Sequence, residues 1–132
     1  MNEAVVKLWL VKADNDLKTG KDELASKNPA TDTVCFHMQQ CVEKYLKAFL
    51  VSKGEEISKT HNLAFILQRC IEVDREFIKI RSSGADELTL YAVGARYPDD
   101  FYMPSLKESK KALRIAERIK KFVLHKLYSR IA

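Results

Sequence analysis

The sequence predicts an all-helical fold: an up-and-down antiparallel bundle of four long helices, with a short extra helix before the last of them. Four glycines and three prolines among 132 residues leave little material for the tight turns of an all-β protein. Hydrophobic residues make up 46% of the chain and charged residues 31%, which is typical of a folded domain. Apolar residues recur at helical spacing, and the length suits one hydrophobic core. We therefore expect a single domain over residues 1–132.

The first two helices are expected on either side of a proline turn. Apolar residues at helical spacing, with lysine and aspartate between them, predict a helix over residues 3–24. The residues that carry its period are Ala4, Leu8, Val11 and Asn15. Pro29 interrupts this pattern. Thr31 or Asp32 can then cap a second helix, which is expected to run to about Lys53.

The second helix divides into an apolar arc and a polar arc when residues are placed about 100° apart. The apolar arc is expected to face the core and consists of Val34, Cys35, Met38, Cys41, Val42, Tyr45, Leu46, Ala48 and Phe49. The polar arc consists of His37, Gln39, Gln40, Glu43, Lys44 and Lys47, with Phe36 among them. A phenylalanine on a polar face needs cover from solvent, and a homodimer interface would supply it.

Three further helices are expected after Gly54, a residue suited to end the second helix. The period of the third helix is carried by Leu63, Ile66, Leu67, Cys70 and Ile71. A short helix is expected over residues 86–95, and Pro98 ends it because proline disfavours helix in the residue before it. Ser105 and Glu108 have the spacing of a capping box, so the last helix is expected to begin there and to continue almost to the end of the chain.

Positive charge is concentrated on the last helix. The chain has 23 lysines and arginines against 18 aspartates and glutamates, and its formal charge of +5 attracts phosphate-bearing partners. A helical wheel places a basic stripe opposite the apolar face of this helix. The members of the stripe are Lys107, Lys110, Lys111, Arg114, Arg118, Lys121 and His125. We interpret the stripe either as a solvated lysine face or as a phosphate-binding surface in which arginine makes bidentate contacts.

Arg118 and His125 form a candidate catalytic pair within this stripe. They lie seven positions apart on one helix face, which separates them by about 10 Å along the axis. A histidine can transfer protons near neutral pH, and an arginine can stabilise charge that develops on a phosphate. The pair is suited to metal-independent RNA cleavage, and the alternative is an inert surface histidine among lysines.

Other kinds of site are disfavoured by the sequence. It contains no glycine-rich phosphate loop, Walker sequence or GxSxG element. His37 and Cys41 have a spacing that would let them share a metal ion, but Cys41 falls on the apolar arc, so we expect no metal and no cofactor. Three cysteines without CxxC spacing predict a reducing compartment, the cytoplasm. Neither a signal peptide nor a membrane-spanning run is expected.

The second helix also carries the most specific motif of the chain. Residues 36–48 read FHMQQCVEKYLKA and resemble the helix signature of HEPN domains (higher eukaryotes and prokaryotes nucleotide-binding), roughly FHxQQxxEKxLKA. Residues 60–63, THNL, resemble the HDL element of the family, although Asn62 stands in place of the aspartate. Residues 95–99, ARYPD, resemble its RYPD element, so the resemblance covers nearly the whole chain.

The resemblance implies a helical bundle, commonly a homodimer, that binds a nucleotide or RNA. Many relatives are encoded beside a small nucleotidyltransferase and belong to toxin–antitoxin pairs. On this basis the candidate nucleotide-binding residues are His37, Gln40, Lys44, Lys47, Arg96 and Tyr97. Catalytic members are metal-independent ribonucleases with an arginine and a histidine a few residues apart. Arg118 and His125 have a permissible gap, but they lie far along the last helix.

Three functional hypotheses follow. The first is an accessory protein that binds a nucleotide or RNA and pairs with a nucleotidyltransferase, the second is a ribonuclease toxin that uses Arg118 and His125, and the third is a purely structural partner of another protein. The candidate binding residues also have a structural alternative. Gln39, Gln40 and Glu43 would then join helices by buried hydrogen bonds. Arg96 would pair with a carboxylate such as Asp99.

Overall fold

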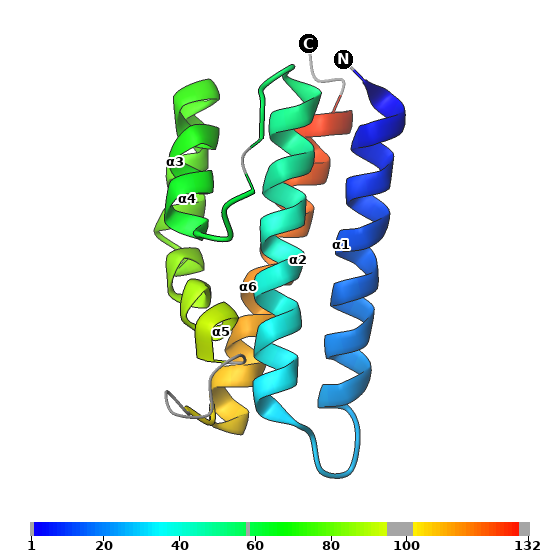
Figure 1. The fold of residues 1–132 in the computed structure, drawn as a ribbon, viewed down its shortest axis with the longest axis vertical. Coiled ribbons are helices and arrows are strands. Elements are labelled where there is room, and N and C mark those ends of the chain that lie inside the picture. Colours follow the sequence, from blue (N-terminus) through cyan, green and yellow to red (C-terminus); the bar gives the residue numbers. More distant parts are fainter. Residues whose placement is uncertain (1, 58, 95–101, 130–132) are drawn as a thin grey trace.

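The computed structural model describes residues 2–57, 59–94 and 102–129 (Figure 1). All regular elements within these residues are helical, as the sequence predicts. They are α1 Glu3–Leu24, α2 Thr31–Ser52, α3 Leu63–Val73, η1 Arg75–Phe77, α4 Ile78–Arg81, η2 Ala85–Leu88, α5 Thr89–Gly94 and α6 Leu106–Tyr128.

The helix ends follow local chemistry, with one correction. Ser105 and Glu108 form both hydrogen bonds of the predicted capping box at the start of α6. Gly54 has a φ of 73°, a left-handed conformation that glycine adopts without strain, and it ends α2 as predicted. The predicted cap by Thr31 or Asp32 is wrong, because Ala30 occupies the N-cap without a side-chain hydrogen bond. Asp32 lies in the first turn instead, where its charge favours the helix dipole.

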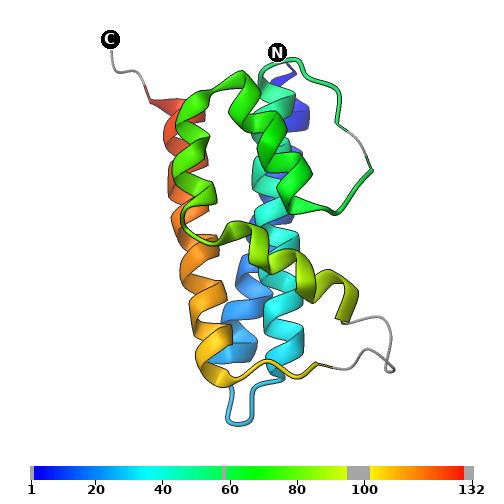
Figure 2. The ribbon, with the colours of Figure 1, turned by 90° about the vertical axis from the view of Figure 1, so that its left-hand side faces the viewer.

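The bundle contains three long helices, and shorter pieces replace the fourth. Figures 1 and 2 show α1 antiparallel to α2 and α6 rising beside α2, with α3 to α5 packed along the remaining side. The parallel course of α2 and α6 follows from contacts at both ends. Ser109 Oγ donates to the Thr31 carbonyl at 3.4 Å, and the Phe77 ring lies 4.4 Å from that of Phe49 and 4.9 Å from that of Phe122.

The predicted third helix is present but interrupted, so the fourth long helix of the bundle is not confirmed as one continuous element. The third helix ends after 11 residues because Asp74 leaves the helical conformation and its side chain caps the turn that follows. Gly84, with a φ of 90°, separates α4 from η2. The short helix predicted over residues 86–95 is confirmed in position as η2 followed by α5. Pro98, predicted to end it, lies outside the described residues.

α2 is the central helix of the molecule. The nine residues of its predicted apolar arc are all fully buried, which confirms that arc as core. The opposite arc is covered as well, because Gln39, Glu43 and Lys47 are at most 5% exposed. Phe36 is partly buried within the single chain and lies edge-on to the ring of His37 at 5.6 Å. The chain itself therefore covers part of Phe36, and the dimer interface there stays a prediction.

The face that α1 turns toward the core also differs from the prediction. Val6, Leu10, Ala13, Leu17 and Gly20 are buried, whereas the predicted line of Ala4, Leu8, Val11 and Asn15 is exposed. Both lines have helical spacing, and the buried one packs closely on α2 because Gly20 has no side chain. A Cβ at Gly20 would stand 2.1 Å from Met38 Cε. The exposed apolar residue Leu8 remains available to line a surface cleft.

Candidate ligand-binding cleft

A cleft of about 500 Å³ lies where α1, α2 and the loop before α3 meet. It is lined by Leu8, Trp9, Lys12, Gln40, Glu43, Lys44, Lys47, Lys59 and His61. Protein sites for small ligands usually measure about 300–1,000 Å³. The cleft is therefore large enough for a mononucleotide.

α1 contributes the apolar wall. Leu8 and Trp9 are neighbours in sequence, and Lys12 follows on the next turn, so the three side chains share one side of the helix. Leu8 is 57% exposed and Trp9 is partly buried. Lys47 Nζ from α2 lies 5.7 Å from the centre of the Trp9 ring, a cation–π arrangement. This wall can receive a planar apolar group such as a base.

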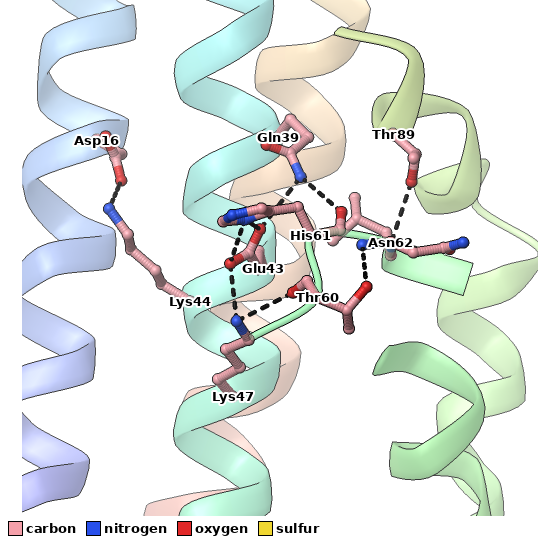
Figure 3. A network of polar contacts seen from close by, with 10 residues as sticks. Asp16, Gln39, Glu43, Lys44, Lys47, Thr60, His61, Asn62 and Thr89 are labelled. Atoms are coloured by element: carbon pink, nitrogen blue, oxygen red, sulfur yellow. Dashed lines mark hydrogen bonds and ion pairs between the residues drawn. The ribbon is translucent and has the colours of Figure 1, made fainter. Parts of the chain in front are cut away.

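α2 contributes the polar wall, with Glu43 at its centre (Figure 3). The helical spacing of Gln40, Glu43, Lys44 and Lys47 places them on one side of α2. The Glu43 side chain is only 4% exposed, and it accepts from Lys47 Nζ at 2.9 Å and from His61 Nδ1 at 2.9 Å. Gln39 Nε2 approaches the same carboxylate at 3.3 Å. These contacts satisfy a buried charge and fix the positions of the lysine and the histidine.

The loop before α3 is held over α2 by two hydrogen bonds from buried side chains. Lys47 Nζ donates to the Thr60 carbonyl and Gln39 Nε2 to the His61 carbonyl, each at 3.2 Å (Figure 3). Asn62 then caps α3 by accepting from the Phe65 N–H at 3.2 Å. An asparagine performs this role as well as an aspartate does. The departure from the HDL element therefore leaves the start of the helix intact.

Asp16 of α1 organises the next turn of α2. It accepts from His37 Nδ1 at 2.9 Å and from Lys44 Nζ at 2.5 Å, and its side chain is only 12% exposed. Lys44 belongs to the cleft, whereas His37 does not line it. The Asp16 carboxylate therefore sets the position of one cleft lysine and neutralises its charge.

Two of the four cleft lysines are matched by carboxylates. Lys44 pairs with Asp16 and Lys47 with Glu43. Lys12 and Lys59 are exposed and form no ion pair among the described residues. The cleft thus combines two fixed, neutralised cations with two free ones, a suitable environment for an anionic ligand.

The cleft brings together half of the predicted nucleotide-binding residues. Gln40, Lys44 and Lys47 line it, His37 lies beside it, and Arg96 and Tyr97 fall outside the described residues. The structural alternative holds for Gln39 and Glu43, which do join α2 to the loop by hydrogen bonds. The sequence prediction missed Leu8, Trp9, Lys12, Glu43, Lys59 and His61 as lining residues. The three-residue spacing of Trp9 and Lys12 could have indicated that they share one side of α1. Lys59 lies in a loop, where no periodic pattern indicates which way a side chain faces.

The basic stripe of α6 is exposed as predicted. All seven of its members, from Lys107 to His125, are exposed, and Lys111 is weakly paired with Glu87 at 3.7 Å. Arg118 has no ion pair or hydrogen bond among the described residues. The buried face of α6 is also as predicted, because Ala112, Ile115, Ala116, Ile119 and Val123 are in the core.

The histidine and cysteine of the possible metal pair lie in different surroundings, because His37 is hydrogen-bonded to Asp16 and Cys41 lies in the core. Cys41 is fully buried, and burial followed by the nearby aspartates Asp16 and Asp14 raises the pKa of its thiol. Burial also raises the pKa of Cys70 to about 12, so neither thiol is a ready thiolate. Across the described ranges, no group of three or more histidine, cysteine or acidic residues is arranged to hold a metal ion. Nor is any helix in these ranges long and apolar enough to span a membrane.

Comparisons with known proteins agree with this fold. The chain matches the model of the HEPN domain over residues 6–127. Its structure is similar to that of TT1696 from Thermus thermophilus, with a TM-score of 0.75 and 25% identity, covering 96% of this chain and 100% of the other. It is also similar to ST0689, an archaeal HEPN homologue, with a TM-score of 0.68 and 21% identity over 93% and 98% of the two chains. No curated protein matches it.

Proposed function

This chain belongs to the HEPN domain family, and on that premise we propose that its cleft binds a nucleotide or RNA. The observation that carries the proposal is the convergence of four lysines and one tryptophan on a single cleft. Lysine side chains attract phosphate groups, and stacking of a base on an aromatic ring contributes about 1–3 kcal/mol. The buried Glu43 network keeps this arrangement preorganised, which lowers the entropic cost of binding.

The test is equilibrium binding of adenosine nucleotides and of a short labelled RNA at two salt concentrations. The double variant Lys12→Gln/Lys59→Gln removes the two free cations without leaving a carboxylate unpaired, so it should weaken binding about tenfold or more. Lys27→Gln is the matched control, because Lys27 is exposed in the turn after α1, at the far end of that helix from the cleft. Undetectable binding by the wild-type protein would refute the proposal.

The second candidate function is metal-independent RNA cleavage by Arg118 and His125. Its support is that both side chains are exposed on one face of α6 and that Arg118 is not engaged by any described carboxylate. End-labelled RNA incubated in EDTA should be cut by the wild-type protein and left intact by Arg118→Ala and by His125→Ala. Arg114→Ala, one turn away on the same stripe, is the control and should keep its activity.

The partner and the compartment are further parts of the proposal. We propose a homodimer that pairs with a small nucleotidyltransferase, in the manner of a toxin–antitoxin system, because the resemblance to HEPN domains implies these partners. Three free, buried cysteines support the cytoplasm as the compartment. A purely structural partner of another protein is the remaining alternative, and it would bind neither nucleotide nor RNA in the assays above.

A further inference from the structure

We propose that the cleft selects a terminal phosphate monoester, as in a nucleoside monophosphate, over a triphosphate or an internal phosphodiester. The inference rests on the proposed function because it concerns the ligand of the same cleft. It follows from the charges that the cleft holds and from their positions.

The first argument is the charge balance. Lys44 and Lys47 are neutralised by Asp16 and Glu43, so only Lys12 and Lys59 offer unmatched positive charge. A phosphate monoester carries a charge of about −1.5 to −2 at neutral pH, which two free lysines can balance. An internal phosphodiester carries a single negative charge and would leave one lysine unmatched.

The lack of a third unmatched lysine among the described lining residues makes additional phosphates unfavourable. Glu43 lines the cleft, and its side chain is 4% exposed and held in place by Lys47 and His61. A second or third phosphate would add negative charge to a cleft whose other two lysines, Lys44 and Lys47, are already matched by carboxylates, so no further free cation would balance it. Like charges in a partly enclosed cleft repel more strongly than in open water. The cleft therefore discriminates against a triphosphate by repulsion.

The second argument is the short distance between the apolar wall and the free cation on α1. Trp9 and Lys12 are three residues apart on one helix, which places their Cβ atoms about 5–6 Å apart. A base packed on Trp9 and Leu8 would have its first phosphate near Lys12, with Lys59 approaching from the loop. Phosphates beyond the first would extend past these two lysines.

The experiment uses Trp9 as the reporter, because it is the only tryptophan in the chain and it lines the cleft. Quenching of its fluorescence is measured with AMP, ADP, ATP and 3′,5′-cyclic AMP in EDTA at low salt. We expect AMP to bind about three- to tenfold more tightly than cyclic AMP, and at least as tightly as ATP. A 5′-phosphorylated trinucleotide tests the source of the phosphate. Affinity equal to that of AMP would support an RNA end, and weaker affinity would support a free mononucleotide.

Asp16→Asn provides the sharpest variant. It keeps the size of the side chain but removes the charge that neutralises Lys44. The affinity for ATP should therefore rise about three- to tenfold relative to the affinity for AMP. Asp22→Asn is the matched control, because it makes the same charge change on the same helix in the exposed Lys18–Asp22 pair. The ratio of ATP affinity to AMP affinity should not change in this control. If Asp16→Asn does not fold, Lys59→Gln in the exposed loop should instead abolish the preference for AMP over cyclic AMP.

The outcomes separate the two proposals. If affinity in the wild-type protein rises with each added phosphate, the inference is wrong and the proposed function stands. The inference is also wrong if the ratio of ATP affinity to AMP affinity changes no more in Asp16→Asn than it does in Asp22→Asn. If neither the nucleotides nor the trinucleotide quench Trp9 or bind by dialysis, the proposed function itself fails.

Discussion

The cleft and the α6 stripe are both rich in lysine, but they hold their charges in opposite ways. In the cleft, the side chain of Lys47 is 6% exposed and that of Lys44 is 22% exposed, and each is paired with a carboxylate. On the stripe the basic side chains are exposed, and Lys111 has only a weak, exposed pair with Glu87. Buried pairs fix positions, whereas exposed charges attract anions without orienting them. The cleft is therefore suited to recognising one ligand, and the stripe to attracting many.

The two surfaces also face different ways. In Figure 1 the loop before α3 lies in front of the long helices and α6 lies behind α2, and Figure 2 shows the same separation from the side. α2 lies between them and packs against both α1 and α6. We therefore expect a small ligand in the cleft to be bound without the stripe. Variants of one surface should leave the function of the other unchanged.

The largest expected effect is on stability, from Glu43→Ala in the cleft. This substitution removes the carboxylate that neutralises Lys47 and leaves a buried cation with only the Thr60 carbonyl and the Trp9 ring as polar contacts. Breaking a buried pair in this way costs about 3–5 kcal/mol. The free energy of unfolding, measured by urea denaturation, should fall by that amount.

The control for this prediction comes from the helix that carries the stripe. Glu117→Ala on α6 removes the partner of Lys21 in an exposed pair at 3.4 Å, and should cost less than about 1 kcal/mol. The double variant Glu43→Leu/Lys47→Leu should recover part of the lost stability, because it buries apolar groups in place of an unpaired charge. Equal losses for Glu43→Ala and Glu117→Ala would show that the buried network contributes no more than a surface pair.

The contrast between α2 and α6 explains what the sequence could predict. In α6 one face is apolar and the other is basic and exposed, so its helical wheel predicts both faces correctly. In α2 the wheel predicts the apolar core arc, but Gln39, Glu43 and Lys47 are buried as well. The loop and α3 that cover them lie far along the chain. A helical period shows how apolar and polar residues are distributed around one helix. It does not show which later segment of the chain packs against that helix.

The same limit applies to the candidate site. Gln40, Lys44 and Lys47 could be predicted because the family motif and the helical period select one edge of α2. Trp9 and Lys12 lie beside Leu8, whose line was expected to face the core but is exposed, so the side chains next to it were not considered as lining a cleft. Lys59 reaches the cleft only because Gln39 and Lys47 hold the backbone of its loop. Such side-chain to backbone contacts have no periodic signature.

The next effect concerns RNA binding by the stripe. The triple variant Lys107→Gln/Lys110→Gln/Lys121→Gln removes three exposed cations that have no ion pair among the described residues. If each contacts a phosphate of single-stranded RNA, the slope of log affinity against log salt should fall by about 0.7 per lysine. Affinity for a mononucleotide should not change, because the cleft is intact. Loss of mononucleotide binding in this variant would show that the two surfaces act together.

The smallest effect concerns Lys126 of α6, which is paired with carboxylates in the same way as Lys44 and Lys47 of the cleft. Its side chain is 17% exposed, and it pairs with Asp74 at 2.8 Å and with Glu76. Burial opposes a low pKa at Asp74, but hydrogen bonds from Lys126 and from the backbone of Glu76 outweigh it and lower the pKa. The hydrogen bond from Lys126 also lowers the pKa of Glu76. Lys126→Met should therefore lower stability at pH 7 only slightly, because solvent screens the pairs.

This loss at Lys126 should depend on pH with a defined sign. A carboxyl group whose pKa is lower in the folded state contributes its full stability above the pKa of the unfolded chain, near 4. The contribution disappears as the pH falls through the lowered folded values, so the difference between Lys126→Met and the wild-type protein should shrink between about pH 5 and pH 2. Urea denaturation at several pH values measures it, with the exposed Lys121→Met as the control. A difference that persists in acid would show that Lys126 acts through its contact with the Phe122 ring, 5.6 Å away, rather than through the carboxylates.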